Sequence, residues 1–173
     1  MLETERLLIR KYTLEDLPRL QEMRSDPSVN VYLGGVKMQN PEALAKRIRF
    51  YIGCYDRYGF GMCGMIWKET GEMIGWSGLQ PLDETGEIEV GYGMIKEFWR
   101  RGIGFEAAKA WLDFGFNQKK LERIVAVAYP ENKGSWGIME KLGMKFEKNE
   151  EHYGALCVFY AITRDEFLER YPE

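Results

Sequence analysis

The sequence predicts a mixed α/β fold, because segments with the period of a helix alternate with segments that have the period of a strand. Three consecutive strands, at residues 60–68, 72–80 and 87–95, are separated by Glu-Thr-Gly and Asp-Glu-Thr-Gly, which are hairpin turn signals. The segment RIVAVAY, at residues 123–129, has almost no polar member, as is typical of a central strand buried on both faces. We therefore expect a sheet with helices packed against it.

The remaining elements follow in the order β-α-α-β-β-β-α-β-α-β-β-α. A strand at 6–12 precedes a helix at 14–24 that Thr13 caps, a loop at 25–35 and a helix at 41–58. After the three hairpin strands come a helix at 102–117, the apolar strand, a short helix at 134–142, strands at 144–148 and 155–162, and a last helix at 164–170. No repeat, low-complexity segment or linker divides the chain. One domain over residues 1–173 is therefore expected.

Charge and hydropathy narrow the classes of partner. The 173 residues carry a net charge of −3, and the pI is about 5.5, so no global positive field favours a nucleic-acid partner. No stretch approaches the ~20 apolar residues that a membrane-spanning helix needs. The start of the chain alternates like a strand and has acidic residues beside its first apolar ones, unlike a secretory signal. These observations favour a cytoplasmic protein with neither a membrane nor a nucleic acid as partner.

Cysteine and histidine usage argues against a metal site. The cysteines, Cys54, Cys63 and Cys157, are odd in number and widely spaced, which predicts buried, reduced side chains. His152 is the only histidine and lies in a Glu-Glu-His-Tyr segment, where it is expected to be a residue of a surface loop. We expect no bound metal.

The segment GYGMIKEFWRRGIGFEAAKAWLDFGF has the pattern of an anion site. An apolar strand ends near Ile95, a short loop contains Arg100 and Arg101, and Gly102 and Gly104 begin an amphipathic helix. Glycine lets the backbone approach a ligand closely, and the free N–H groups and dipole of a helix N-terminus attract a pyrophosphate. RRGIG alone is weak evidence, since a tight turn with solvated arginines has the same pattern. The segment matches neither the dinucleotide GxGxxG nor the P-loop motif.

Two further features strengthen this interpretation. The strand EIEVGYGMI has two glycines near its end, which indicate a bulge or a close backbone approach. About thirty residues after the first block, Pro-Glu-Asn-Lys-Gly-Ser precedes a short helix that ends in Lys-Leu-Gly-Met. Together with TERLLIRKYTLEDLPRL, SDPSVNVYLGG, FWRRGIGFEAA and NKGSWGIMEKLGMKFE, these blocks resemble the GNAT acetyltransferase superfamily and, within it, the RimJ/RimL-like branch. The resemblance spans residues 3–163.

This resemblance implies a mostly antiparallel, seven-stranded mixed sheet flanked by helices, in which two splayed parallel strands form an acyl-CoA cleft. The pantetheine arm of acetyl-CoA would bond to the backbone near Met94 and Ile95. The pyrophosphate would lie on the amides of residues 101–106, with charge from the two arginines, and Asn132 and Ser135 would meet the cofactor from the second block. The simpler alternative for the second block is a plain helix N-terminus with a capping serine. The implied cofactor-binding residues are Met94, Ile95, Arg100, Arg101, Gly102, Ile103, Gly104, Phe105, Glu106, Asn132 and Ser135.

The implied reaction is transfer of an acetyl group from acetyl-CoA to a primary amine, by direct attack of the amine on the thioester. Glu89 occupies the acidic position before the Gly-Tyr of EVGYGM, where related enzymes place a base, and Glu87 is a reserve candidate on the same face of the strand. Both carboxylates are alternatively solvent-facing strand residues. N–H groups freed by a bulge around Gly93 to Ile95 would polarise the thioester carbonyl.

Two positions depart from the superfamily pattern. Trp99 replaces a glutamine or arginine, and Met139 stands where many members have the tyrosine that protonates the leaving thiolate. Because methionine cannot donate a proton, Ser135 becomes the candidate donor, with Tyr92 and Tyr153 as weaker ones.

The acceptor and the oligomeric state stay open. A protein or peptide N-terminal α-amine fits the branch resemblance, and a small-molecule amine (an amino acid, a polyamine or an antibiotic) is the alternative. A second alternative is an acyl-CoA-binding sensor of the same fold without catalysis. The chain is expected to be a monomer or a homodimer.

Overall fold

The computed structural model describes residues 1–33 and 40–172. Its strands form one sheet in the order β1-β2-β3-β4-β5-β6-β8-β7. The bounds of the strands are β1 Leu2–Glu3, β2 Leu7–Lys11, β3 Met62–Trp67, β4 Met73–Pro81, β5 Ile88–Met94, β6 Arg123–Ala128, β7 Lys145–His152 and β8 Ala155–Thr163. The helices are α1 Leu17–Ser25, α2 Pro27–Asn30, α3 Pro41–Tyr58, α4 Ile103–Asp113, α5 Lys133–Leu142 and α6 Arg164–Arg170. Short 3-10 turns span Leu14–Asp16 and Lys96–Phe98, and a π-helical turn, Phe114–Gln118, follows α4.

Local signals in the sequence account for the ends of the helices. The Asn40 side chain accepts a hydrogen bond from the Ala43 amide (2.8 Å), and Pro41 then opens α3. Gly59, at φ +74°, ends the same helix in the left-handed conformation. Gly143, at φ +90°, ends α5 in the same way.

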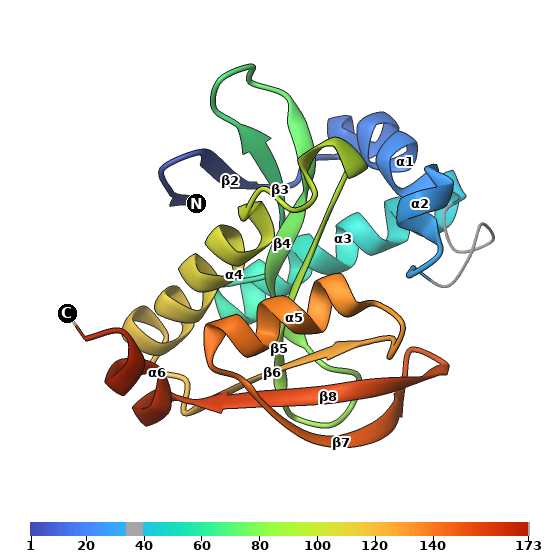
Figure 1. The fold of residues 1–173 in the computed structure, drawn as a ribbon. Helices are drawn as coiled ribbons and strands as arrows, with labels where there is room; N and C mark the ends of the chain where they lie inside the picture. Colours follow the sequence, from blue (N-terminus) through green and yellow to red (C-terminus); the bar gives the residue numbers. More distant parts are fainter. Residues whose placement is uncertain (34–39, 173) are drawn as a thin grey trace.

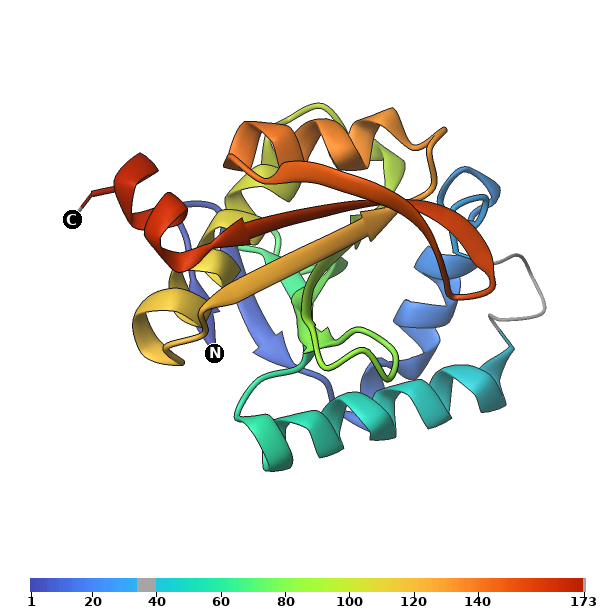
Figure 2. The same ribbon diagram turned by 90° about the horizontal axis from the view of Figure 1, so that it is seen from below.

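The sheet lies between two layers of helices. Figure 2 shows α3 on one side of the sheet and α4 and α5 on the other. The α4 and α5 side holds the larger core, in which Trp111, Phe116 and Leu7 are almost fully buried. The helices α1 to α3 cover the other face, over a core that includes Leu20, Ile48 and other apolar residues.

The two halves of the sheet separate between β5 and β6. The strands β2 to β5 are antiparallel, and β6 and β8 are antiparallel, but β5 and β6 are parallel and share a single register pair, Glu89 with Val125. In Figure 1, β4 and β5 run steeply down the view whereas β6 and β8 run across it. The predicted mixed sheet with two splayed parallel strands is thus confirmed.

The structure differs from the expected elements in three places. The sheet has eight strands rather than seven, because the two-residue β1 pairs with β2. The predicted loop 25–35 contains α2, and its residues 34 and 35 lie outside the described part. The predicted strand 144–148 continues to His152, since β7 is an edge strand whose charged side chains make its sequence look like a loop.

Among the described residues, no helix is long and apolar enough to span a membrane.

Candidate functional site

Where β6 turns away, β5 presents unpaired backbone. The Ile95 amide donates to the Ile74 carbonyl of β4 (3.0 Å). Backbone groups alternate sides along an antiparallel strand, so Gly93 and Gly91 also point at β4, whereas Tyr92 and Met94 point at the opposite edge. That edge lies beyond the single register pair with β6.

This alternation corrects the predicted role of Ile95. The Ile95 amide donates a hydrogen bond to β4, and the Ile95 carbonyl accepts one from the Phe98 amide (3.1 Å). Neither backbone group is therefore free for a cofactor. Met94 keeps its expected position at the open edge, where the Trp99 indole already donates to its carbonyl (2.9 Å). The free backbone groups of the cleft therefore belong to Tyr92 and to the Met94 amide.

The expected bulge around Gly93 is absent, because β4 and β5 keep a continuous register from Gly75–Met94 to Pro81–Ile88. A Cβ on Gly93 would lie 2.3 Å from the Trp76 ring, so this glycine makes room for a neighbouring indole. The N–H groups predicted to polarise a thioester carbonyl are therefore not freed by a bulge at this position.

The first turn of α4 lies where the sequence predicts an anion cradle. Gly102, at φ +77°, precedes the helix, and no side chain caps it among the described residues. The amides of the first turn lack helical acceptors and point along the axis. The Glu106 amide is different, since it donates to the Gly102 carbonyl (3.0 Å). The first-turn amides without an acceptor are therefore those of residues 101–105, which we call the cradle, and the Glu106 amide, predicted to be part of it, is not free.

The cradle glycines have different roles. A Cβ on Gly102 would meet only the Arg6 guanidinium, at 3.5 Å, so its conformation, not its space, requires glycine. A Cβ on Gly104 would lie 2.8 Å from Ile138 of α5 and 3.2 Å from Met94. Gly104 thus serves the packing of α4 on α5. Ile103, next to it, is fully buried in the core.

The two loop arginines also differ. The Arg101 guanidinium lies over the rings of Trp67 (5.3 Å) and Phe98 (5.0 Å). Arg100 is exposed, at φ +58°, and no contact holds its side chain within the described residues. Arg100 is the one of the pair that is free to meet a phosphate.

The Glu106 carboxylate binds the N-terminal segment. Thr4 donates to it through Oγ1 (2.6 Å), and Arg6 donates through its amide (2.9 Å) and its Nε (2.7 Å). Arg6 also donates to the Arg101 carbonyl (2.9 Å). These contacts tie the cradle to β1 and β2.

An open hollow of about 610 Å³ adjoins the cradle. Gly102 and Phe105 line it together with Lys141, Arg170 and Tyr171. Two cations thus lie beside the uncapped helix.

The second block meets β5 through Tyr92. Asn132 caps α5, and its Oδ1 accepts the Ser135 amide (3.2 Å), so the capping residue is the asparagine rather than the serine. The Tyr92 hydroxyl donates to the Ser135 carbonyl (2.8 Å), and the Ser135 hydroxyl lies 3.5 Å from the Tyr92 hydroxyl. Burial raises the pKa of Tyr92, which keeps this phenol protonated. Met139, in the next turn, is buried in the core.

Glu89 lies on the opposite face of β5 from Tyr92, because the two are separated by an odd number of positions. It is buried, and its Oε2 accepts the Tyr153 hydroxyl, with Gln80 Nε2 at 3.5 Å. Burial raises the pKa of Glu89 from an ordinary 4.5 to about 7, although the hydrogen bonds from Tyr153 and Gln80 oppose this. A carboxyl of this kind exchanges a proton near neutral pH, as a general base must.

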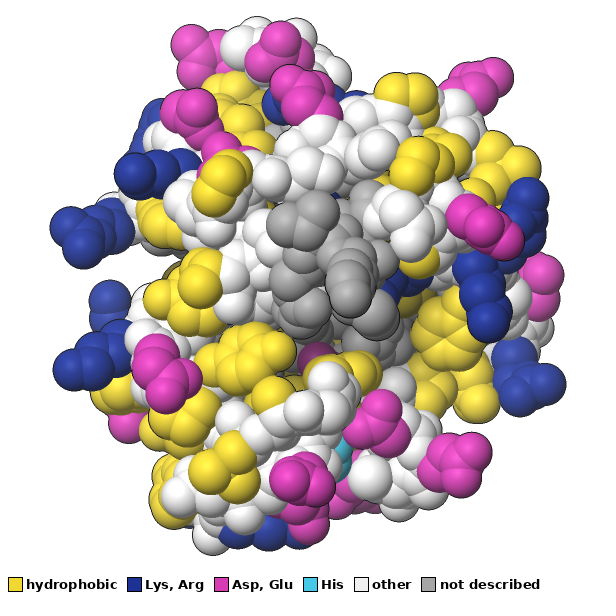
Figure 3. Space-filling model, turned by 90° about the vertical axis from the view of Figure 1, so that its right-hand side faces the viewer, with side chains coloured by type: hydrophobic (Ala, Val, Ile, Leu, Met, Phe, Trp, Pro, Cys, Tyr) yellow, Lys and Arg dark blue, Asp and Glu magenta, His cyan; other side chains and the backbone are white. Residues whose placement is uncertain are grey.

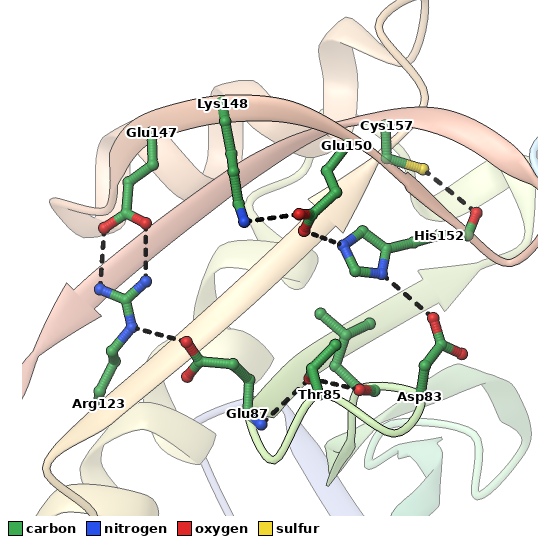
Figure 4. Close-up of polar contacts among 10 residues, drawn as sticks. Asp83, Thr85, Glu87, Arg123, Glu147, Lys148, Glu150, His152 and Cys157 are labelled. Carbon is green, nitrogen blue, oxygen red and sulfur yellow. Dashed lines mark hydrogen bonds and ion pairs between the residues drawn. The ribbon is translucent and has the colours of Figure 1, made fainter.

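Glu87 has a different environment. It precedes β5, and its Oε1 accepts Arg123 Nε (3.1 Å), while Arg123 also makes two bonds to Glu147 (2.8 and 2.7 Å; Figure 4). The structure therefore separates the two candidate bases. Glu89 is buried beside a tyrosine, whereas Glu87 belongs to an ion-paired cluster.

The sequence missed the group around His152. This side chain is buried at the end of β7, and its ring nitrogens contact Asp83 (3.1 Å) and Glu150 (2.9 Å; Figure 4). The prediction of a surface-loop residue was wrong, because the ring lies between Asp83 and Glu150 and packs beside the Phe159 ring. Figure 3 shows acidic side chains gathered near the histidine on this face. No motif in the sequence marks this cluster.

Comparison with known proteins identifies the architecture. The protein-family model for the acetyltransferase (GNAT) domain matches residues 6–145 of this chain. The chain belongs to the GNAT acetyltransferase family. It is 33% identical over 147 residues to the uncharacterized N-acetyltransferase p20 of Bacillus licheniformis, covering 84% of this chain and 83% of that protein. The uncharacterized N-acetyltransferase YoaA of Bacillus subtilis is 30% identical over 148 residues, with coverage of 85% and 84%.

A solved GNAT-family acetyltransferase from Bacillus anthracis has the same fold. It superposes with a TM-score of 0.79 at 28% identity, covering 94% of this chain and 98% of that one. The GNAT resemblance in the sequence is thereby confirmed, and with it the predicted activity, the transfer of an acetyl group to an amine. Among the described residues of this GNAT domain, no group of three His, Cys, Asp or Glu side chains is placed to hold a metal ion.

Proposed function

We propose that the protein transfers the acetyl group of acetyl-CoA to a primary α-amine at the N-terminus of a peptide or protein. One observation carries this proposal. The strands β5 and β6 diverge after one register pair, with a buried carboxyl, Glu89, on one face of β5 and the N-terminal turns of α4 and α5 beside the other face. A base and an anion cradle on opposite faces suit an amine and a thioester that meet in the gap.

The residues present fit acetyl-CoA. The pyrophosphate would accept hydrogen bonds from the amides of residues 101–105, with charge from Arg100. The hollow lined by Lys141 and Arg170 would receive the phosphate at the nucleotide end of the same molecule. The pantetheine amides would pair with the free backbone of Tyr92 and Met94. Asn132 would offer its amide nitrogen, since its oxygen caps α5. When bound, acetyl-CoA supplies an activated acetyl group as a thioester.

The reaction needs two proton transfers, one away from the amine nitrogen and one to the departing sulfur. The amine nitrogen forms a bond to the thioester carbonyl carbon, the carbon–sulfur bond breaks, and the sulfur leaves with the electron pair. Glu89 accepts the proton that the amine nitrogen loses, directly or through water. The Ser135 hydroxyl, beside Tyr92, would pass a proton to the departing sulfur and take one back from solvent, in place of the tyrosine that Met139 replaces. A backbone N–H group that the pantetheine arm leaves free, from Tyr92 or Met94, would take the carbonyl oxygen.

The choice of acceptor follows from the strength of the base. An α-amine has a pKa of ~7.7–8.0 and a lysine side chain of ~10.4. A carboxyl with a pKa of about 7 is matched to the former. The RimJ/RimL-like sequence blocks favour the same acceptor. Two neighbours similar in fold alone have different acceptors by name. They are the ribosomal-protein-S5-alanine acetyltransferase of Vibrio fischeri (18% identical, TM-score 0.75) and the spermidine N-acetyltransferase of Vibrio cholerae (16%, 0.76).

We further propose that residues 1–173 form one N-acetyltransferase domain that acts in the cytoplasm as a monomer or homodimer, without a metal. None of these properties is needed for the chemistry above.

Release of CoA in the presence of different amines tests the proposal. Purified protein is mixed with acetyl-CoA and with peptides, polyamines, amino acids or aminoglycosides, and the free thiol is measured. Peptides with a free N-terminus should stimulate release, and the same peptides with a blocked N-terminus should not. Stimulation by small amines alone would reassign the acceptor. Binding of CoA with no stimulation by any amine would favour the sensor, the alternative that buried Met139 suggests.

A further inference from the structure

His152 joins two elements at the acceptor side of the cleft. It ends β7, and its Nδ1 lies 3.1 Å from Asp83 Oδ2, in the connection between β4 and β5. Its Nε2 lies 2.9 Å from Glu150 Oε2 on its own strand. The Cys157 thiol of β8 donates to the His152 carbonyl (3.8 Å), so main chain and side chain are both held (Figure 4).

The two contacts fit an imidazolium. A neutral imidazole donates from one nitrogen only, and its other nitrogen would meet a carboxylate with lone pair against lone pair. With both nitrogens protonated, His152 donates to Asp83 and to Glu150 at once. The other groups that face it are Lys148 of β7, which pairs with Glu150 (2.7 Å), the Phe159 ring of β8 (5.8 Å), and the Glu89 carboxyl of β5.

The residue after His152 reaches the proposed base. Tyr153 and Gly154 form the β7–β8 turn, at φ +54° and +78°. The residue Tyr153 is 55% exposed, yet its hydroxyl donates to Glu89 and accepts from Gln80 Nε2 (3.1 Å). A left-handed conformation is costly for tyrosine and persists only where neighbouring contacts fix it.

We propose that His152 is a positioning residue that acts through Tyr153: by linking Asp83 to Glu150 it fixes the β7–β8 turn, and the turn holds the Tyr153 hydroxyl on Glu89. The proposal rests on the proposed function only in that Glu89 is the base. The clamp itself is a property of the free protein, so it is tested without catalysis.

The test follows the titration of the Glu89 carboxyl by carbon-13 NMR in the free protein, with Glu89→Gln to assign the signal. Tyr153→Phe removes a hydrogen bond to the ionised carboxylate, which should raise the pKa of Glu89 by about one unit. His152→Gln, which is uncharged at every pH, should raise it by a similar amount because the turn is released.

The double variant separates the clamp from a direct effect of the imidazolium charge on Glu89. If His152 acts through Tyr153, His152→Gln adds little once Tyr153 is already Phe. If the imidazolium charge acts directly on Glu89, His152→Gln raises the pKa of Glu89 by the full amount even in the Tyr153→Phe variant, and the proposal is overturned. It is overturned as well if His152→Gln alone leaves the titration unchanged. Glu151→Gln, an exposed neighbour in the same strand, should leave the titration of Glu89 where it is.

The pH profile of kcat/KM then reports on the proposed function by itself. If the titration of Glu89 moves in these variants and the acidic limb of kcat/KM moves with it, the clamp and the base are both supported. If the titration moves and the kinetic limb does not, the clamp stands and Glu89 is not the base. His152→Gln and Tyr153→Phe are compared by thermal unfolding, and Glu150→Gln, which weakens the same link, provides a second variant should His152→Gln fail to fold.

Discussion

At the scale of single residues, the buried carboxyl of Glu89 makes stability depend on pH. Its raised pKa means that the folded state binds this proton more tightly than the unfolded state does. The folded state therefore loses stability as the pH rises from about 4.5 towards about 7. Glu89→Gln removes this loss. We expect the variant to gain about 2.5 kcal/mol relative to the wild type between about pH 5 and about pH 8.

Urea unfolding at both pH values measures this gain, with Glu87→Gln as the matched control. The control removes a carboxylate that is paired with Arg123 and should show no such gain with pH. A stability difference for Glu89→Gln that does not grow with pH would mean that Glu89 ionises in the fold as easily as in the unfolded chain.

Ser135 is the second residue whose role a substitution can isolate. If its hydroxyl donates to the leaving sulfur, Ser135→Ala should lower kcat by ~10²-fold while the Kd for CoA changes little. Steady-state kinetics and calorimetry measure the two quantities. Tyr92→Phe is the comparison, since it removes the partner hydroxyl 3.5 Å away. A normal kcat for Ser135→Ala together with a large loss for Tyr92→Phe would move the role to the tyrosine.

Single residues were predictable from the sequence only where a motif marks them. Glu89 stands just before the Gly-Tyr of a motif and is buried, and its role as a base stays a prediction. Tyr153 was a weak candidate, and its contact with Glu89 depends on a turn whose path no local pattern encodes. His152 was misjudged because its neighbours are charged, although those carboxylates are the reason it can be buried.

At the scale of elements, the first strands hold the cradle. Arg6, just before β2, donates to the Arg101 carbonyl and to the Glu106 carboxylate, so the loop before α4 is ordered before a ligand arrives. Without these bonds the ligand must order the loop itself. We therefore expect Arg6→Ala to raise the KM for acetyl-CoA about threefold to tenfold, with kcat unchanged.

Arg10→Ala is the control for this prediction. The Arg10 side chain is as exposed as that of Arg6, at 35%, and it pairs with Asp16 instead of the cradle. Steady-state kinetics with varied acetyl-CoA compares the two variants. An equal rise in KM for both would indicate a general loss of stability and contradict a specific role for Arg6.

Elements were predictable where one physical signal dominates. Hydrophobic period and capping residues predicted α3 and α4 closely, and the buried β6 followed from its apolar run. The signal failed for β7, whose exposed, charged side chains reflect its place at the sheet edge. It also failed for the glycines of β5, which the sequence interprets as a bulge and which instead accommodate Trp76. Edge position and cross-strand packing are tertiary properties, so a single segment does not reveal them.

At the scale of the whole molecule, the fold places the residues proposed for the two halves of the reaction on opposite faces of the sheet. The helices α4 and α5 lie on one face of the sheet with the anion cradle, and Glu89 and the β7–β8 turn lie toward the other. The sequence predicted this architecture through its order of elements and its linked motifs. Which carboxylate enters the cleft depends on the register of β5 and on Arg123, a residue from another strand.

The direct test of the central claim is the pH dependence of kcat/KM for Glu89→Gln beside Glu87→Gln. Glutamine keeps the shape of the side chain and removes its basicity. We predict that Glu89→Gln lowers kcat/KM by ~10²-fold or more at about pH 7, and that activity partly recovers as the pH approaches the pKa of the amine. The Kd for CoA should not change, and Glu87→Gln should keep full activity. Full activity of Glu89→Gln, with or without a loss in Glu87→Gln, would contradict the account.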